Sequence, residues 1–163
     1  MSGVFMILLA ALTLTGQAFA NPPYPRDMPI LTLYPTGGGE AYTLTLDDLE
    51  ALPARTVGGF IPDIGDESAE WFGVSLSVLL EALGEPLPQR LTASALDNYH
   101  EIIPRHDIEH FDPIIAYRRN GEYLPFSEHG PLVIMYPYAQ YPALMKRTYY
   151  SRTVWQLSEI RAE

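Results

Sequence analysis

The chain of 163 residues carries 20 acidic against 10 basic side chains, for a formal net charge of −10, and it contains no cysteine. This acidity argues against a nucleic-acid-binding protein, because such proteins need a basic surface to neutralise phosphates. Without cysteine there are no disulfides, so a hydrophobic core must stabilise the fold unaided.

The first twenty residues are typical of a secretory signal peptide. The apolar run Val4–Leu14 is too short to span a membrane, and Ala18-Phe19-Ala20 provides a small–x–small cleavage site. No Lys or Arg precedes the run, so an uncleaved anchor is the competing interpretation. We expect export to the periplasm, a signal peptide at 1–20 and a single mature domain at 21–163.

The segment Asn21–Pro29 is rich in proline and should form an extended leader with little structure of its own. A β-hairpin is expected next. The apolar run Ile30–Tyr34 suits one strand and Tyr42–Leu44 its partner, with a turn at 35–39.

Thr45 predicts the start of a short helix, because Asp48 follows it at the capping-box spacing. Pro53 should end this helix. A strand at Arg55–Ile61 and an acidic loop at 63–70 are expected to follow.

The clearest helix signal comes directly after Trp71-Phe72-Gly73-Val74. Ser75 is a candidate N-cap, and Gly84 stands at the favoured C-terminal position. Between them an apolar stripe has helical spacing. The stripe consists of Leu76, Leu79, Leu80 and Leu83.

The remaining chain is dominated by predicted strands. These strands are Gln89–Leu96, Tyr99–Ile103, Ile114–Arg119, Pro131–Tyr136 and Thr153–Arg161. Asp97-Asn98 should form a turn, and Asn120-Gly121 is typical of a tight hairpin. We therefore predict one α+β domain, with a mixed β-sheet core and a few short helices.

His106 and His110 have the i, i+4 spacing that places two imidazoles on one helix face. Pro104 and Pro113 flank them and favour a short turn instead of a helix. We expect a solvated polar turn here and no metal site.

Three segments, read in order, resemble the oxidoreductase molybdopterin-binding family, which has the sulfite-oxidase-like fold. They are W-F-G-V-S-L at 71–76, A-L-D-N-Y at 95–99 and N-G-E-Y-L-P-F-S-E-H-G-P-L at 120–132, and the tail S-R-T-V-W-Q-L at 151–157 extends the match. Redox enzymes of this family hold molybdenum through a cysteine thiolate, which no other side chain can replace. The resemblance thus implies a retained pterin pocket and argues against molybdenum.

Within that family the chain resembles a short, exported, cysteine-free branch, through G-P-L-V-I-M-Y-P-Y at 130–138. Some members of this branch bind a reduced pterin in the periplasm. They pass its presence to a membrane-bound enzyme that makes or degrades cyclic di-GMP. The resemblance therefore implies a non-catalytic sensory module with a pterin ligand and a membrane signalling partner.

A pterin is a flat bicycle with N–H donors beside a carbonyl acceptor, so its site needs ring faces, an acceptor and a donor. The matching segments contain all three. Stacking candidates are Trp71, Tyr99, Tyr136 and Trp155, acceptor candidates are Asp97 and Asn98, and donor candidates are His129 and Arg152. The alternative interpretation of each aromatic residue is packing in the core. For His129 the alternative is a loop histidine that is hydrogen-bonded to the backbone. Alanine at Trp71 or Trp155 should abolish binding and leave the protein folded.

Two other functions stay open at this point. One is a molybdopterin-dependent oxidoreductase with atypical metal ligation, and the other is an accessory periplasmic protein with an empty pocket. Hydrolase and nucleotide-binding motifs are absent from the sequence. The basic pairs Arg118-Arg119 and Lys146-Arg147 indicate a local anion-tolerant face despite the overall charge.

Overall fold

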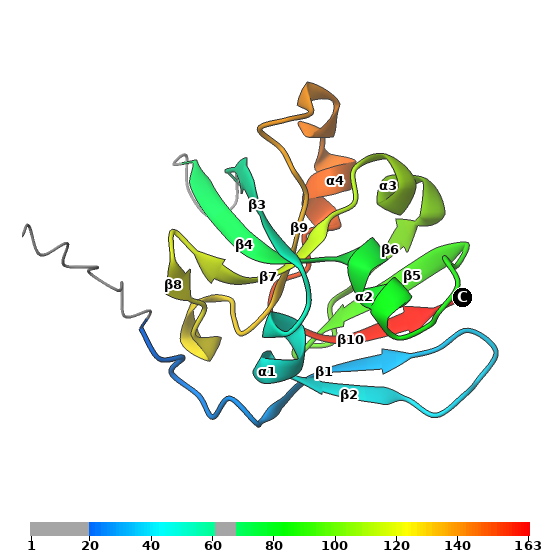
Figure 1. Cartoon of the computed structure of the whole chain (residues 1–163). Coiled ribbons are helices and arrows are strands. Elements are labelled where there is room, and N and C mark those ends of the chain that lie inside the picture. The colour runs from blue at the N-terminus through cyan, green and yellow to red at the C-terminus, as the bar shows by residue number, and fades with distance from the viewer. Residues whose placement is uncertain (1–19, 61–67) are drawn as a thin grey trace, which may run out of the picture.

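The computed structural model describes residues 20–60 and 68–163, and Figure 1 shows their path. The predicted signal peptide therefore lies outside the described residues except for Ala20, and most of the predicted acidic loop also lies outside them. Within the described ranges no helix combines the length and apolarity that crossing a membrane requires.

The first sheet has the strand order β2-β1-β10-β5-β6. Its strands are β1 (Pro29–Tyr34), β2 (Tyr42–Thr45), β5 (Arg90–Ala95), β6 (His100–Pro104) and β10 (Leu157–Ala162). β1 and β10 run parallel, and the other neighbours are antiparallel. The C-terminal strand thus lies between two hairpins, which brings the chain before β10 beside the β5–β6 turn (Figure 1).

The second sheet is antiparallel throughout, in the order β3-β4-β7-β8, with β9 also paired to β7. Its strands are β3 (Ala54–Gly59), β4 (Ala69–Ser75), β7 (Ile114–Arg119), β8 (Glu122–Tyr123) and β9 (Val133–Met135). The predicted Asn120-Gly121 hairpin joins β7 to β8, and both of its residues have positive φ. The buried strand expected near 131–136 is confirmed as β9.

Short helices connect these strands. They are α1 (Leu46–Glu50), α2 (Leu76–Ala82), α3 (Arg105–His110), α4 (Arg147–Ser151) and the 3₁₀ helices η1 (Phe126–Glu128) and η2 (Pro142–Leu144). The capping box of α1 is confirmed: Asp48 N–H donates to Thr45 Oγ1 at 3.2 Å, and Thr45 N–H donates to Asp48 Oδ2 at 2.8 Å. α2 begins after Ser75 as predicted, but the Ser75 hydroxyl accepts from Arg55 Nε instead of capping the helix.

One continuous hydrophobic cluster contains residues of both sheets and of the helices packed on them. Leu33 and Ala93 contribute from the first sheet, and Val74 and Ile115 from the second, all fully buried. In a chain without disulfides, burial of this apolar surface is the main source of stability.

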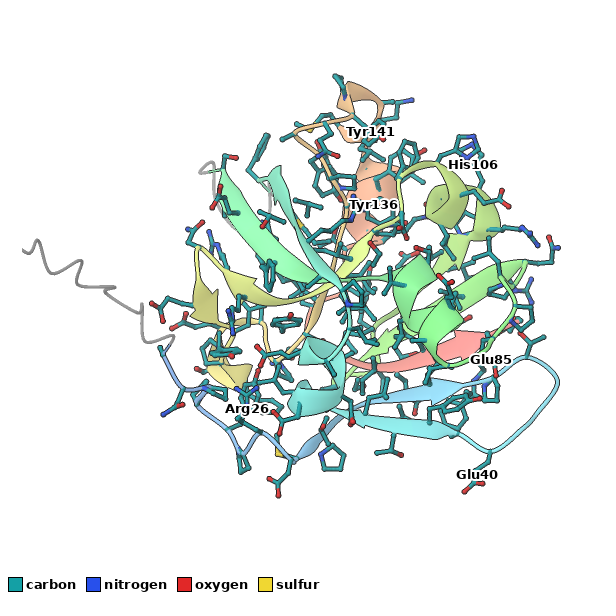
Figure 2. All side chains as sticks on the ribbon, in the orientation of Figure 1. Arg26, Glu40, Glu85, His106, Tyr136 and Tyr141 are labelled. Carbon is teal, nitrogen blue, oxygen red and sulfur yellow. The ribbon has the colours of Figure 1, made fainter. Side chains whose placement is uncertain are left out.

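The proline-rich leader is more ordered than predicted. Tyr24 is buried against Phe126, with 5.5 Å between the ring centroids. Arg26 forms ion pairs with Asp47, at 2.6 Å, and with Glu50, so it lies beside α1 (Figure 2). The prolines extend the leader, whereas Arg26 and Tyr24 hold it against the rest of the protein. The prediction did not include these two contacts.

Two element predictions were wrong. Residues 105–110 form the helix α3 instead of a turn, because a helix of this length fits between the flanking prolines and gains the Arg105–Glu109 ion pair at 2.7 Å. The last strand begins at Leu157 instead of Thr153. The four residues before it leave the sheet and run along the cleft described below.

Gly73 lies at the register shift in the pairing of β4 with β7, and a side chain there has no room. An added Cβ would lie 2.0 Å from the Ile115 carbonyl oxygen and 2.6 Å from Ala116 Cα. Because these are backbone atoms, Gly73→Ala should lower the free energy of unfolding by about 2–3 kcal/mol, measured by urea denaturation. The control is Gly37→Ala, where a Cβ meets nothing within 4 Å and only the positive φ of 83° is penalised, at about 1 kcal/mol. Equal stability of the two variants would contradict the close approach of β4 and β7.

Candidate functional site

A cleft of about 610 Å³ opens between the β5–β6 turn and α4. This volume is in the range of sites for small organic ligands. Three parts of the chain line it: the turn, the loop residue His129, and the stretch from α4 to the start of β10. The strand order of the first sheet is what brings these parts together, since β10 pairs with β5.

The β5–β6 turn forms one wall through Asp97 and Tyr99. Asp97 Oδ1 accepts the Tyr99 N–H at 3.0 Å, an Asx turn that fixes the carboxylate. Asn98 has a left-handed φ of 68°, and its N–H donates to the Ala95 carbonyl at 3.2 Å. Among the described residues Asp97 Oδ2 has no hydrogen-bond partner, so it can accept from a ligand.

Trp155 provides the aromatic surface of the cleft. Its ring lies 5.9 Å from that of Trp71, which is buried behind it and donates Nε1–H to the Gly59 carbonyl. The His129 ring also lies close, at 5.1 Å from Trp155. The His129 carbonyl accepts the Gln156 N–H at 2.9 Å, so a backbone bond holds the imidazole beside the indole.

α4 forms the opposite wall through Arg147, Tyr150 and Ser151. Arg147 is exposed and brings a permanent positive charge to the rim. The Tyr99 hydroxyl donates to the Ser151 carbonyl at 2.7 Å and thereby joins the two walls. Burial and the adjacent Glu101 carboxylate raise the pKa of Tyr99 to about 12, so this hydroxyl keeps its proton at neutral pH.

A buried ion pair holds the end of α4 to the body of the protein. Asp107, only 1 % exposed, accepts from Arg152 Nη1 at 2.7 Å and from the Tyr136 hydroxyl at 2.7 Å. Burial and the charge of Asp107 raise the pKa of Tyr136 well above its usual value, so its hydroxyl stays a donor. Figure 2 shows Tyr136 in the interior of the molecule. This pair positions the wall of the cleft but does not line it.

The structure brings half of the predicted site residues to the cleft. Those that line it are Asp97, Tyr99, His129 and Trp155. His129 is exposed there, and among the described residues its ring makes no hydrogen bond to the backbone. Whether these four side chains bind a ligand stays a prediction.

The other four predicted site residues do not line the cleft. Trp71 and Tyr136 are 2 % and 0 % exposed, so neither offers a ring face to a ligand. Arg152 turns away to Asp107, and Asn98 shapes the turn without lining the cleft.

Sequence reasoning missed most of the α4 wall. Tyr150 and Ser151 lie on a helix of five residues, which is too short to show any periodicity. Arg147 had one signal, the Lys146-Arg147 pair, but that pair indicated only an anion-tolerant surface and no position.

The two histidines of α3 lie apart from the cleft lining. Their rings stack at 3.9 Å, and His106 points outward in Figure 2. Across residues 20–60 and 68–163, no group of three or more His, Asp or Glu side chains is placed to hold a metal ion.

The cleft thus combines an aromatic surface, a carboxylate acceptor and a cation on the opposite wall. A flat, polar heterocycle matches this set: the indole contacts its face, Asp97 pairs with N–H donors, and Arg147 or His129 donates to a carbonyl or an anionic substituent. All three groups are accessible from solvent, because the cleft is open at its rim.

Part of the region around the cleft matches a known protein family. A family model described as the oxidoreductase molybdopterin binding domain matches residues 36–141. No curated protein matches the chain. The matched residues include the β5–β6 turn and His129, whereas α4 and Trp155 lie beyond them.

Among solved structures, the sulfane dehydrogenase SoxCD from Paracoccus pantotrophus is similar, with a TM-score of 0.62 at 20 % sequence identity. The match covers 84 % of this chain and 38 % of that chain, so this protein spans well under half the length of its structural relative. At this identity the likeness shows the fold alone, and it confirms the predicted α+β, sulfite-oxidase-like architecture.

Proposed function

Because this chain belongs to the oxidoreductase molybdopterin-binding domain family, we propose that its cleft binds a pterin and that the protein is a non-catalytic periplasmic sensor. In this proposal the bound pterin controls a membrane-bound enzyme of cyclic di-GMP turnover. A reduced pterin is the expected ligand.

One observation carries the ligand assignment: the aromatic, acceptor and cationic groups of the cleft face one shared space. Trp155 stands beside His129 at 5.1 Å, Asp97 has an unpaired oxygen among the described atoms, and Arg147 stands on the facing wall. This set is complementary to the face and the pyrimidine edge of a pterin. The family membership supports the same ligand class.

The donor set of the cleft does not fit molybdenum. In this family the metal requires a thiolate, and the chain has no cysteine to supply one. The cleft offers a carboxylate, a phenol that keeps its proton, an imidazole and a guanidinium instead. This supports a pterin without a metal, and hence binding without redox catalysis.

A partner surface is available at the rim of the cleft. Leu96 and Tyr99 in the β5–β6 turn are 53 % and 42 % exposed. Tyr99 also lines the cleft, so a ligand that shifts it changes the outer surface. This supports ligand-dependent contact with a signalling partner.

The experiment is to purify the exported protein, denature it, and analyse the released molecules by mass spectrometry and the metals by elemental analysis. We expect a pterin in near-equimolar amount from the wild type and none from a Trp155→Ala control. Stoichiometric molybdenum would overturn the proposal and would support a molybdopterin-dependent oxidoreductase instead. If no pterin is released and added reduced pterins do not bind, the protein is an accessory protein with an empty pocket.

A further inference from the structure

Met145 is exposed beside the cleft, unlike the other methionines of the described residues. Met145 is 40 % exposed, whereas Met135 is fully buried in β9 and Met28 is packed against the core. Met145 follows η2 and lies shortly before α4. A two-electron oxidant in solvent therefore reaches this sulfur more readily than the other two.

The Met145 sulfur contacts a residue of the cleft. The Tyr150 hydroxyl donates to Met145 Sδ at 3.6 Å, and Tyr150 is part of the α4 wall. The Tyr150 ring packs on Tyr138 at 5.5 Å. Tyr138 in turn is hydrogen-bonded at 2.7 Å to Thr153, which also lines the cleft. The Tyr150 side chain thus links the Met145 sulfur to the cleft in which a ligand would bind.

Oxidation would change this contact in both size and polarity. A thioether is a weak acceptor, whereas a sulfoxide is polar and chiral. The added oxygen is a stronger acceptor than the sulfur, so the Tyr150 hydroxyl that donates to Sδ at 3.6 Å should re-aim towards it. The Tyr150 side chain lines the cleft, so this movement alters the wall that a ligand contacts.

We propose that Met145 is an oxidation site for a hypohalous acid, and that its sulfoxide lowers the ligand affinity of the cleft through Tyr150. In the reaction with hypochlorous acid the sulfur loses two electrons and gains the oxygen atom, and chloride and a proton are released. The loss of affinity rests on the proposed pterin-binding function, but the oxidation site does not.

The first test needs no ligand. The purified protein is treated with hypochlorous acid below stoichiometry, and the methionine-containing peptides are quantified by mass spectrometry. Met145 should be oxidised at least about tenfold faster than Met135. Comparable oxidation of the two residues would overturn the proposed site.

The second test measures coupling to the cleft. After oxidation the wild type should bind a reduced pterin about fivefold more weakly, whereas Met145→Leu should bind equally well before and after treatment. Met28→Leu is the matched control and should keep the wild-type response. An unchanged affinity of the oxidised wild type, or an equal loss in Met145→Leu, would overturn the coupling.

If the protein binds no pterin, the proposed function is refuted, but the effect of oxidation on Tyr150 is then tested without a ligand. In tyrosine-labelled protein, the Tyr150 ring signals, assigned with Tyr150→Phe, should shift on oxidation of the wild type and not of Met145→Leu. Signals that do not shift in the wild type would overturn the contact between the sulfoxide and Tyr150.

Discussion

Trp155→Ala is expected to weaken pterin binding by about 100-fold while the protein stays folded. Trp155 is half-buried and lines the cleft, and its ring contacts those of Trp71 and His129. Truncation removes the face on which a flat ligand stacks. Affinity is measured by titration with a reduced pterin, and folding by circular dichroism and urea denaturation.

Two variants make this prediction specific. Trp155→Phe retains a ring and should keep most of the affinity. Trp71→Ala removes a core residue that is 2 % exposed, so it should lower the free energy of unfolding by about 3–5 kcal/mol. The original expectation that Trp71→Ala leaves the protein folded is therefore replaced. If Trp155→Ala binds as tightly as the wild type, the ligand does not occupy this cleft.

Arg152→Met should lower the free energy of unfolding by about 3–5 kcal/mol. The substitution leaves the Asp107 carboxylate buried, and its remaining side-chain partners among the described residues are the Tyr136 hydroxyl at 2.7 Å and His106 Nδ1 at 3.6 Å. An uncompensated charge in the interior costs far more than a broken ion pair at the surface. Urea denaturation at neutral pH measures the loss.

The double variant Asp107→Asn/Arg152→Met should recover most of that loss, because it removes the stranded charge and keeps an acceptor for Tyr136. Arg161→Met is the surface control. Arg161 is half exposed and lies 3.6 Å from Glu159, so its loss should stay below about 1 kcal/mol. A similarly small loss in Arg152→Met would contradict the buried ion pair.

The local elements were predictable because their signals are local. The Thr45–Asp48 capping box, the Asn120-Gly121 hairpin and the leucine stripe of α2 each depend on residues within one turn or one helix. The structure has all three where the sequence placed them. The order of strands within each sheet depends on contacts between distant segments and was not predicted.

The site was only partly predictable, because a motif identifies a segment and not the direction of its side chains. Trp71 follows the exposed Glu70 in β4, so the alternation of a strand turns its indole inward. The sequence predicts no strand at 69–75, so this alternation gave no prediction for Trp71. Arg152 could not be assigned in this way, since its partner Asp107 lies on a different helix.

The Tyr99 hydroxyl has two acceptors within reach, the Ser151 carbonyl at 2.7 Å and Glu101 Oε1 at 3.1 Å, but only one proton to donate. The hydrogen bond from Tyr99 to Ser151, which joins the two walls of the cleft, is therefore exchangeable and worth about 1 kcal/mol. Thermal motion of exposed side chains breaks such a contact on the nanosecond timescale. Entry of a ligand should thus be fast, and the lifetime of the complex should depend on the stacking and polar contacts inside.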